Sequence, residues 1–241
     1  MQGAHDQATR AAERKRVIRN AVGIGLATGA YALSFGAISV AAGLSVVQTS
    51  ALSLLMFTGA SQFALVGVLS GGGGAIAAAA TSALLGTRNG LYGFRLASLL
   101  QARGPRRLLA AHLVIDESTA MAIGQDSAEA GRLGFWATGT SVFVLWNAGT
   151  LTGALAARAL SDPRSLGLDA AVPAAFLALL APRLRRGEPA VVGVVAAVVA
   201  LATVPFVPAG VPVLVAGVVA VIAGLLSRRS QTAPESGLGG P

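Results

Sequence analysis

Long apolar blocks, separated by short polar stretches, make up most of this chain. A helix that crosses a bilayer needs about 20 mostly apolar residues, and eight blocks approach that length. One begins near residue 75, and the others cover residues 21–44, 46–69, 108–124, 133–157, 168–184, 190–204 and 211–226. The pattern predicts an all-α, polytopic integral membrane protein with about eight transmembrane segments, or six or seven if some blocks do not cross.

Polar sequence flanks this apolar region at both ends. We therefore expect a cytoplasmic N-terminal segment over 1–20, a frayed stretch or short helix along the headgroups, then one transmembrane domain over 21–226 and a disordered cytoplasmic tail over 227–241. The block at 108–124 is short and polar, which favours a broken or re-entrant helix. Gly43-Leu44-Ser45 and Gly167-Leu168-Asp169 each open an alanine- and leucine-rich run. They hint at an inverted repeat, which many transporters contain.

Arginine and lysine clusters predict the orientation, because cytoplasmic loops are enriched in both residues. Eight crossings place three clusters inside: residues 14–19, residues 183–186 and residues 228–229. The cluster Arg103, Arg106 and Arg107 then falls outside. Either the rule is violated there, or the third or fourth block does not fully cross.

Composition supports the membrane assignment. Charged residues make up 12% of the chain and hydrophobic residues 54%, whereas soluble domains average about 25% charged. The 31 glycines suit closely packed transmembrane helices. The formal net charge of +8 comes from arginines between apolar blocks, so it is better explained by membrane topology than by nucleic-acid binding. The chain has no cysteine, which excludes disulfides and thiolate metal sites, and we expect no metal or cofactor.

A polar, glycine-containing sequence interrupts the second block. Ser61 and Gln62 follow Gly59 there. A local break at the glycine would expose backbone groups to a ligand, and both side chains can hydrogen-bond a substrate. The alternative is that they bridge to a neighbouring helix.

Acidic residues in the fourth block form a second candidate group. His112 and Asp116 are four residues apart and would share one helix face. Asp116 and Glu117 would point about 100° apart, so both should not face one small pocket. Buried carboxyls of this kind carry protons in coupled transporters, but charges solvated at an interface, or paired with Arg88 or Arg95, are an equal alternative.

Two further groups lie in the third and fifth blocks. Arg88 could bind a carboxylate in bidentate fashion, with Asn89 beside it, although snorkelling to the headgroups is the alternative. In the fifth block, Asn147 needs a partner at mid-segment, whereas Gly149 and Gly153 form a G-x-x-x-G pattern that favours helix packing. Asp169, with Pro173 after it, is typical of a helix N-cap.

At these positions the chain resembles the AzlC-type branched-chain amino acid permeases. The resemblance spans roughly residues 20–225, and one departure is Arg88-Asn89, where the family commonly has Arg-His, so a proton-transfer role of that histidine does not carry over. The matching segments are Gly59-Ala60-Ser61-Gln62-Phe63, Thr87 to Gly93, Asp116-Glu117-Ser118, Asn147-Ala148-Gly149-Thr150, Gly167-Leu168-Asp169, Pro173 and Phe176 to Leu180.

The resemblance implies a secondary exporter of valine, leucine and isoleucine, driven by the proton gradient, with a small hydrophobic AzlD-type subunit as partner. Such a protein is a multi-pass protein of the plasma (inner) membrane and not an enzyme. The substrate carboxylate would meet Ser61, Gln62 or Arg88, with Asn89 and Asn147 as further substrate-binding residues. The ammonium would meet Asp116 or Glu117, which are also the proton-coupling candidates.

Two other function classes remain open. Gly59-Ala60-Ser61 has the start of a G-x-S nucleophile turn, and His112 could be its base in an intramembrane serine hydrolase, provided that the two side chains are within hydrogen-bond reach. A channel or non-catalytic membrane scaffold is the third class.

Overall fold

A computed structural model describes residues 2–159, 181, 187–207 and 211–231. This part of the chain consists of α-helices, one 3-10 turn and connecting loops, without a strand, which confirms the all-α class. The block at 168–184, the arginine cluster at 183–186, Asp169 with Pro173, and the last ten residues lie outside the described residues.

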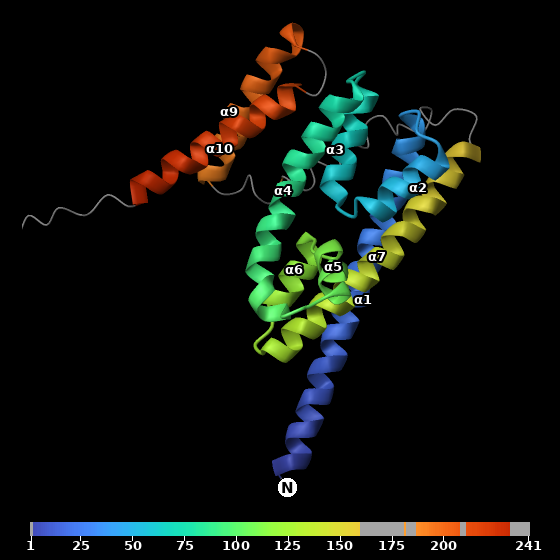
Figure 1. Ribbon diagram of the computed structural model, residues 1–241, viewed down its shortest axis with the longest axis vertical. Helices are drawn as coiled ribbons and strands as arrows, with labels where there is room; N and C mark the ends of the chain where they lie inside the picture. Colours follow the sequence, from blue (N-terminus) through green and yellow to red (C-terminus); the bar gives the residue numbers. More distant parts are fainter. Residues whose placement is uncertain (1, 160–180, 182–186, 208–210, 232–241) are drawn as a thin grey trace, which may run out of the picture.

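Two long helices, α1 (Gln2–Ala41) and α7 (Ala128–Ala159), pack against each other along one side of the molecule (Figure 1). Both are long and apolar enough to cross a membrane. They run parallel, because Gly25 lies against Ser141 near one end and Gly36 against Thr150 further along. The N-terminal segment is the first half of α1, rather than a frayed or separate piece.

Helices α2 (Val46–Leu55) and α3 (Gly59–Ser70) form a hairpin instead of one continuous span. The Ser53 hydroxyl of α2 donates a hydrogen bond to the Thr150 hydroxyl of α7, and Phe57, four residues later, packs on Phe143. Because the later residue contacts an earlier part of α7, α2 runs antiparallel to α7. Helix α3 then turns back, since Phe63 packs on Phe35 of α1. The expectation of a single crossing over 46–69 is therefore wrong.

Helices α5 (Pro105–His112) and α6 (Asp116–Ile123) form a second hairpin that enters from the other end. Helix α6 returns along the first half of α7, where Gly131 lies against Ala122 and Gly139 against Leu113. The broken form expected for this block is confirmed. The break at residues 113–115 also means that His112 and Asp116 belong to different helices, so they do not share a face as their spacing predicted.

Helix α4 (Ala75–Leu100) connects the two hairpins and packs antiparallel to α3 (Figure 1). The turn before it contains Gly72, whose φ of 80° is readily adopted by glycine. Arg88 lies at the midpoint of α4. The two apolar blocks at 190–204 and 211–226 are present as α9 (Gly187–Thr203), the 3-10 turn η2 (Val204–Phe206) and α10 (Val211–Gln231).

Basic residues from three elements lie at one end of the molecule. Arg10 and Arg14 of α1 line a hollow with Glu129 at the start of α7. Arg132 donates to the carbonyl of Leu99 at the end of α4, and the Arg106 guanidinium lies 5.2 Å from the Trp136 ring. The Arg103–Arg107 cluster therefore shares the end of the N-terminal cluster, and the predicted conflict disappears because neither hairpin passes from one end to the other.

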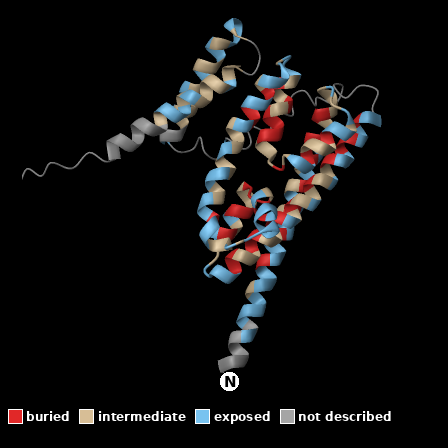
Figure 2. Ribbon diagram, in the orientation of Figure 1, coloured by how far each residue is buried: buried red, intermediate tan, exposed pale blue. Residues whose placement is uncertain are grey.

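The two hairpins and the helices that follow them have opposite directions. Helices α2 and α3 precede descending α4, and helices α5 and α6 precede ascending α7 (Figure 1). This inverted arrangement differs from the predicted repeat, which relied partly on residues 167–169. Buried residues gather where α1, α3, α6 and α7 meet, whereas the described part of α9 and α10 contains none (Figure 2).

Candidate functional site

A cavity of about 600 Å³ lies between the two hairpin tips, within the usual size range of ligand pockets. Helices α1, α3, α4, α6 and α7 all contribute to its wall. The tips meet beside Phe143, at the midpoint of α7: the Phe57 ring lies 5.1 Å and the His112 ring 5.6 Å from it. The lining residues are Ala27, Thr28, Tyr31, Phe57, Thr58, Gly59, Ala60, Phe63, Leu85, Arg88, Ile115, Asp116, Glu117, Val142 and Trp146.

An ion pair provides the main charges of the cavity. Arg88 Nη2 lies 3.0 Å from Asp116 Oδ2, and about a third of each side chain is exposed. Arg88 Nε and Asp116 Oδ1 have no hydrogen-bond partner within the described residues. Because a separate donor and acceptor stay unpaired, the pair can bind a ligand that carries both an anionic and a cationic group.

Glu117 lies in the same cavity as Asp116. The prediction that both carboxyls could not face one pocket is therefore wrong. The two residues begin α6 directly after the helix break, and the cavity extends around this helix end instead of facing one side of a continuous helix. Among the described residues, two carboxyls and one guanidinium line the cavity, so acidic groups are in excess there.

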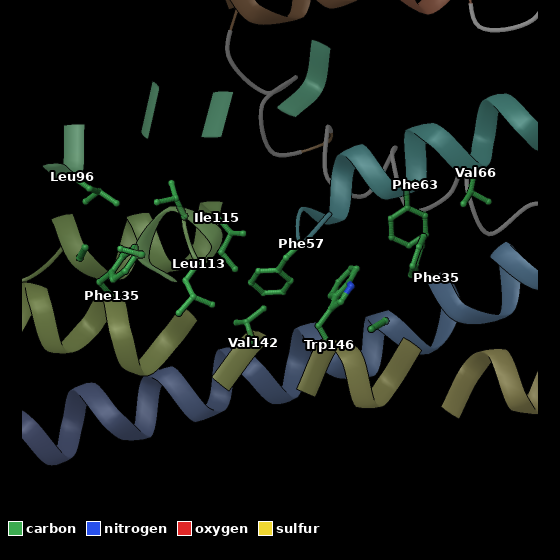
Figure 3. Close-up of a cluster of buried hydrophobic side chains, with 14 of the residues drawn as sticks. Phe35, Phe57, Phe63, Val66, Leu96, Leu113, Ile115, Phe135, Val142 and Trp146 are labelled. Atoms are coloured by element: carbon green, nitrogen blue, oxygen red, sulfur yellow. The ribbon is translucent and has the colours of Figure 1, made fainter. Parts of the chain in front are cut away.

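Aromatic rings form much of the remaining wall. Tyr31, Phe57, Phe63 and Trp146 all line the cavity, and Figure 3 shows Phe57 between Ile115 and Trp146. Tyr31 packs on Phe63 at 5.0 Å between ring centroids. The cavity therefore presents an apolar wall beside a pair of charges.

Gln62 does not line the cavity and is fully buried. Its Oε1 accepts from the Trp146 indole N–H at 3.0 Å, and its Nε2 donates to the Met56 carbonyl at 2.7 Å. That carbonyl lies in the break between α2 and α3. Within the fold, the amide group of Gln62 thus hydrogen-bonds a carbonyl of the helix break and Trp146 of the cavity wall.

Ser118 forms the corresponding hydrogen bonds at the break between α5 and α6. Its hydroxyl donates to the Leu113 carbonyl at 2.6 Å and accepts from the Ile115 N–H at 3.1 Å. No separate role was predicted for this residue from the sequence. A short polar side chain in the first turn after a break was the available sign.

Three other predicted substrate-binding residues lie outside the cavity lining. Ser61 is 1% exposed and lies beside Gly86 of α4. Asn89 is half-buried, with an unpartnered Oδ1. Asn147 donates to the Phe143 carbonyl within α7. The structure brings together only Arg88, Asp116 and Glu117 of the predicted set.

The hydrolase alternative needs a base beside Ser61. The Ser61 hydroxyl has no hydrogen-bond partner within the described residues. His112 packs instead against the rings of Phe57 and Phe143. Because a nucleophile and its base must be within hydrogen-bond reach, this arrangement does not favour serine chemistry.

Comparison with known proteins shows the family of this chain. The family model of the AzlC protein matches residues 23–160, which include both hairpins and every residue of the cavity lining. The chain belongs to the AzlC family.

One AzlC relative is described as an uncharacterized membrane protein of Archaeoglobus fulgidus. It is 32% identical over 156 residues, which cover 64% of this chain and 68% of the relative. No solved structure matches the chain. The family and the apolar helices identify a membrane protein of a permease-type family.

Proposed function

We propose that this AzlC protein is a secondary transporter that exports branched-chain amino acids. The Arg88–Asp116 pair in an apolar, aromatic cavity is the observation that carries the proposal. A zwitterionic amino acid presents a carboxylate to Arg88 and an ammonium to Asp116, replacing the internal ion pair. The apolar wall accepts a valine, leucine or isoleucine side chain.

Glu117 and Asp116 are the proposed proton-coupling groups. Both carboxyls line the cavity, but a single guanidinium faces them. An unbalanced carboxylate at membrane depth is costly, whereas a proton removes its charge. Proton binding here would connect substrate movement to the proton gradient.

The proposed membrane arrangement places the basic end in the cytoplasm. Helices α1, α4 and α7 cross, and the two hairpins are re-entrant, with tips near the bilayer midplane. In this plasma (inner) membrane arrangement the N-terminus is cytoplasmic, since Arg103–Arg107 and the N-terminal cluster follow the positive-inside rule together. Three crossings place the end of α7 outside, so the proposed cytoplasmic C-terminus further requires that the block at 168–184 crosses together with α9 and α10. A small hydrophobic subunit of the AzlD type completes the exporter.

Efflux from preloaded cells tests this proposal. The chain is expressed alone and with an AzlD-type subunit, and valine and leucine efflux is measured with and without a protonophore. We expect saturable efflux that requires the subunit and collapses with the protonophore. Ohmic conductance would instead indicate a channel, and unchanged efflux in every condition would contradict the proposal.

Arg88→Gln tests the site itself. Loss of a charged hydrogen-bond partner costs about 1.5–3 kcal/mol, so we expect efflux efficiency to fall roughly 10- to 100-fold. The matched control is Arg95→Gln, since Arg95 lies two turns away on α4 and outside the cavity lining. Equal activity of the two variants would exclude Arg88 as the carboxylate site.

A further inference from the structure

The indole of Trp146 is held on several sides in the cavity wall. Its ring stacks on Phe35 at 6.1 Å and meets Phe63 edge-on at 6.4 Å. The residue is 5% exposed, and its N–H donates to Gln62. Phe35 and Phe63 are themselves fully buried, so the ring packs against the interior of the protein on these sides.

Gly59 provides the space for the remaining edge of the indole. A Cβ atom at this position would lie 3.0 Å from Cη2 and 3.4 Å from Cζ2 of Trp146. The first distance is shorter than an ordinary van der Waals contact, and the second is at the lower limit of that range. Any side chain at Gly59 would therefore push the ring, and the open cavity is the direction left to it.

Gln62 connects the indole to the first hairpin. Its amide oxygen accepts a hydrogen bond from the indole N–H, and its amide nitrogen donates one to the Met56 carbonyl at the helix break. The position of the ring thus depends on the hairpin. Gln62 acts through Trp146, without lining the cavity itself.

We infer that Trp146, positioned by Gln62 and Gly59, determines the size of the side chain that the cavity accepts. The inference rests on the proposed function, because charges at Arg88 and Asp116 fix the backbone end of the substrate. The side chain must then lie along the apolar wall. Trp146 has the largest side chain in that wall, so its displacement or truncation changes the available volume most.

Gly59→Ala should make the cavity smaller. One methylene in an apolar pocket changes efficiency by about 10-fold or more, so we expect the leucine-to-valine ratio of efflux efficiencies to fall by about 10-fold. Gly90→Ala is the matched control, because no atom lies within 4 Å of a Cβ there. It should leave the ratio unchanged.

Trp146→Phe should make the cavity larger. Efflux or counterflow of phenylalanine should rise relative to leucine by a similar factor. Gln62→Leu removes the bond that fixes the ring, so it should weaken discrimination between leucine and phenylalanine more than it lowers total efflux. A purely structural role of Gln62 would reduce efflux of every substrate equally.

Binding can be measured independently of transport. The chain has two tryptophans, so Trp136→Phe leaves Trp146 as the single emitter. We expect leucine to change Trp146 emission in this variant, and Gly59→Ala to weaken that response relative to valine.

The two possible failures give different results. Wild-type export with size ratios unchanged in Gly59→Ala and Trp146→Phe would overturn the inference and leave the proposed function intact. No export and no emission change with any branched-chain amino acid would overturn the proposed function.

Discussion

At the residue scale, the polar side chains after each helix break satisfy backbone groups that the break exposes. Gln62 bonds the Met56 carbonyl, and Ser118 bonds the Leu113 carbonyl. A buried backbone group without a partner is costly. Breaks in an apolar interior therefore require such side chains, whether or not a ligand binds.

Ser118→Ala should destabilise the second hairpin. It leaves the Leu113 carbonyl and the Ile115 N–H without their side-chain partner, which costs about 1–3 kcal/mol. Thermal unfolding of purified protein in detergent should show a lower midpoint. Ser98→Ala, at an exposed site of α4, is the control; equal midpoints for both variants would show that the break does not depend on Ser118.

The sequence identified the charged part of the site better than its neutral polar part. Arg88, Asp116 and Glu117 line the cavity, because charges inside apolar blocks are stable only in such places. Gln62 was predicted to bind substrate, and that role is untested. Its actual partners could not be foreseen, since they depend on which carbonyl the helix break frees.

At the element scale, small residues allow α1 and α7 to approach closely. The G-x-x-x-G pattern of Gly149 and Gly153 was expected to serve packing, and the structure confirms this. A Cβ at Gly149 would overlap the Gly29 carbonyl, and one at Gly153 would overlap the Leu33 carbonyl. The packing of α1 against α7 thus depends on close contact between the backbones of these two helices.

Gly153→Ala should separate the two helices. Such overpacking costs about 1–3 kcal/mol, so the purified variant should unfold at a lower temperature or aggregate. Gly93→Ala introduces the same methyl group where no atom lies within 4 Å. It should be neutral or slightly stabilising. A Gly153→Ala variant as stable as Gly93→Ala would contradict the close packing.

The two helix breaks differed in how visible they were in the sequence. The second was predicted because His112, Asp116 and Glu117 make its block polar. The first lies at Met56-Phe57-Thr58, directly before Gly59, where the polar sequence indicated a local break within one span. The hydrophobic pattern did not show that the chain reverses direction there, because the apolar residues on both sides are compatible with one long span.

At the scale of the whole molecule, the hairpins determine which loops share an end. Eight full crossings would put residues 70–75 with the N-terminus and residues 101–107 opposite to it. The structure reverses both assignments, because α2 and α3 return to the end from which they entered. The position of Arg103, Arg106 and Arg107, which conflicted with eight crossings, was therefore evidence that some blocks do not cross. The sequence alone did not show which blocks these are.

Single-cysteine labelling tests this topology, and the absence of native cysteine makes each engineered thiol unique. In intact cells, a membrane-impermeant thiol reagent should label Gly74→Cys, an exposed position with open space around it. Arg103→Cys and Gln7→Cys, both exposed at the basic end, should react only after permeabilisation. Eight full crossings predict the opposite result at residues 74 and 103 with the same result at residue 7. Labelling of Arg103→Cys from outside would therefore show that the hairpins cross, and it would remove the central meeting of their tips on which the proposed substrate site depends.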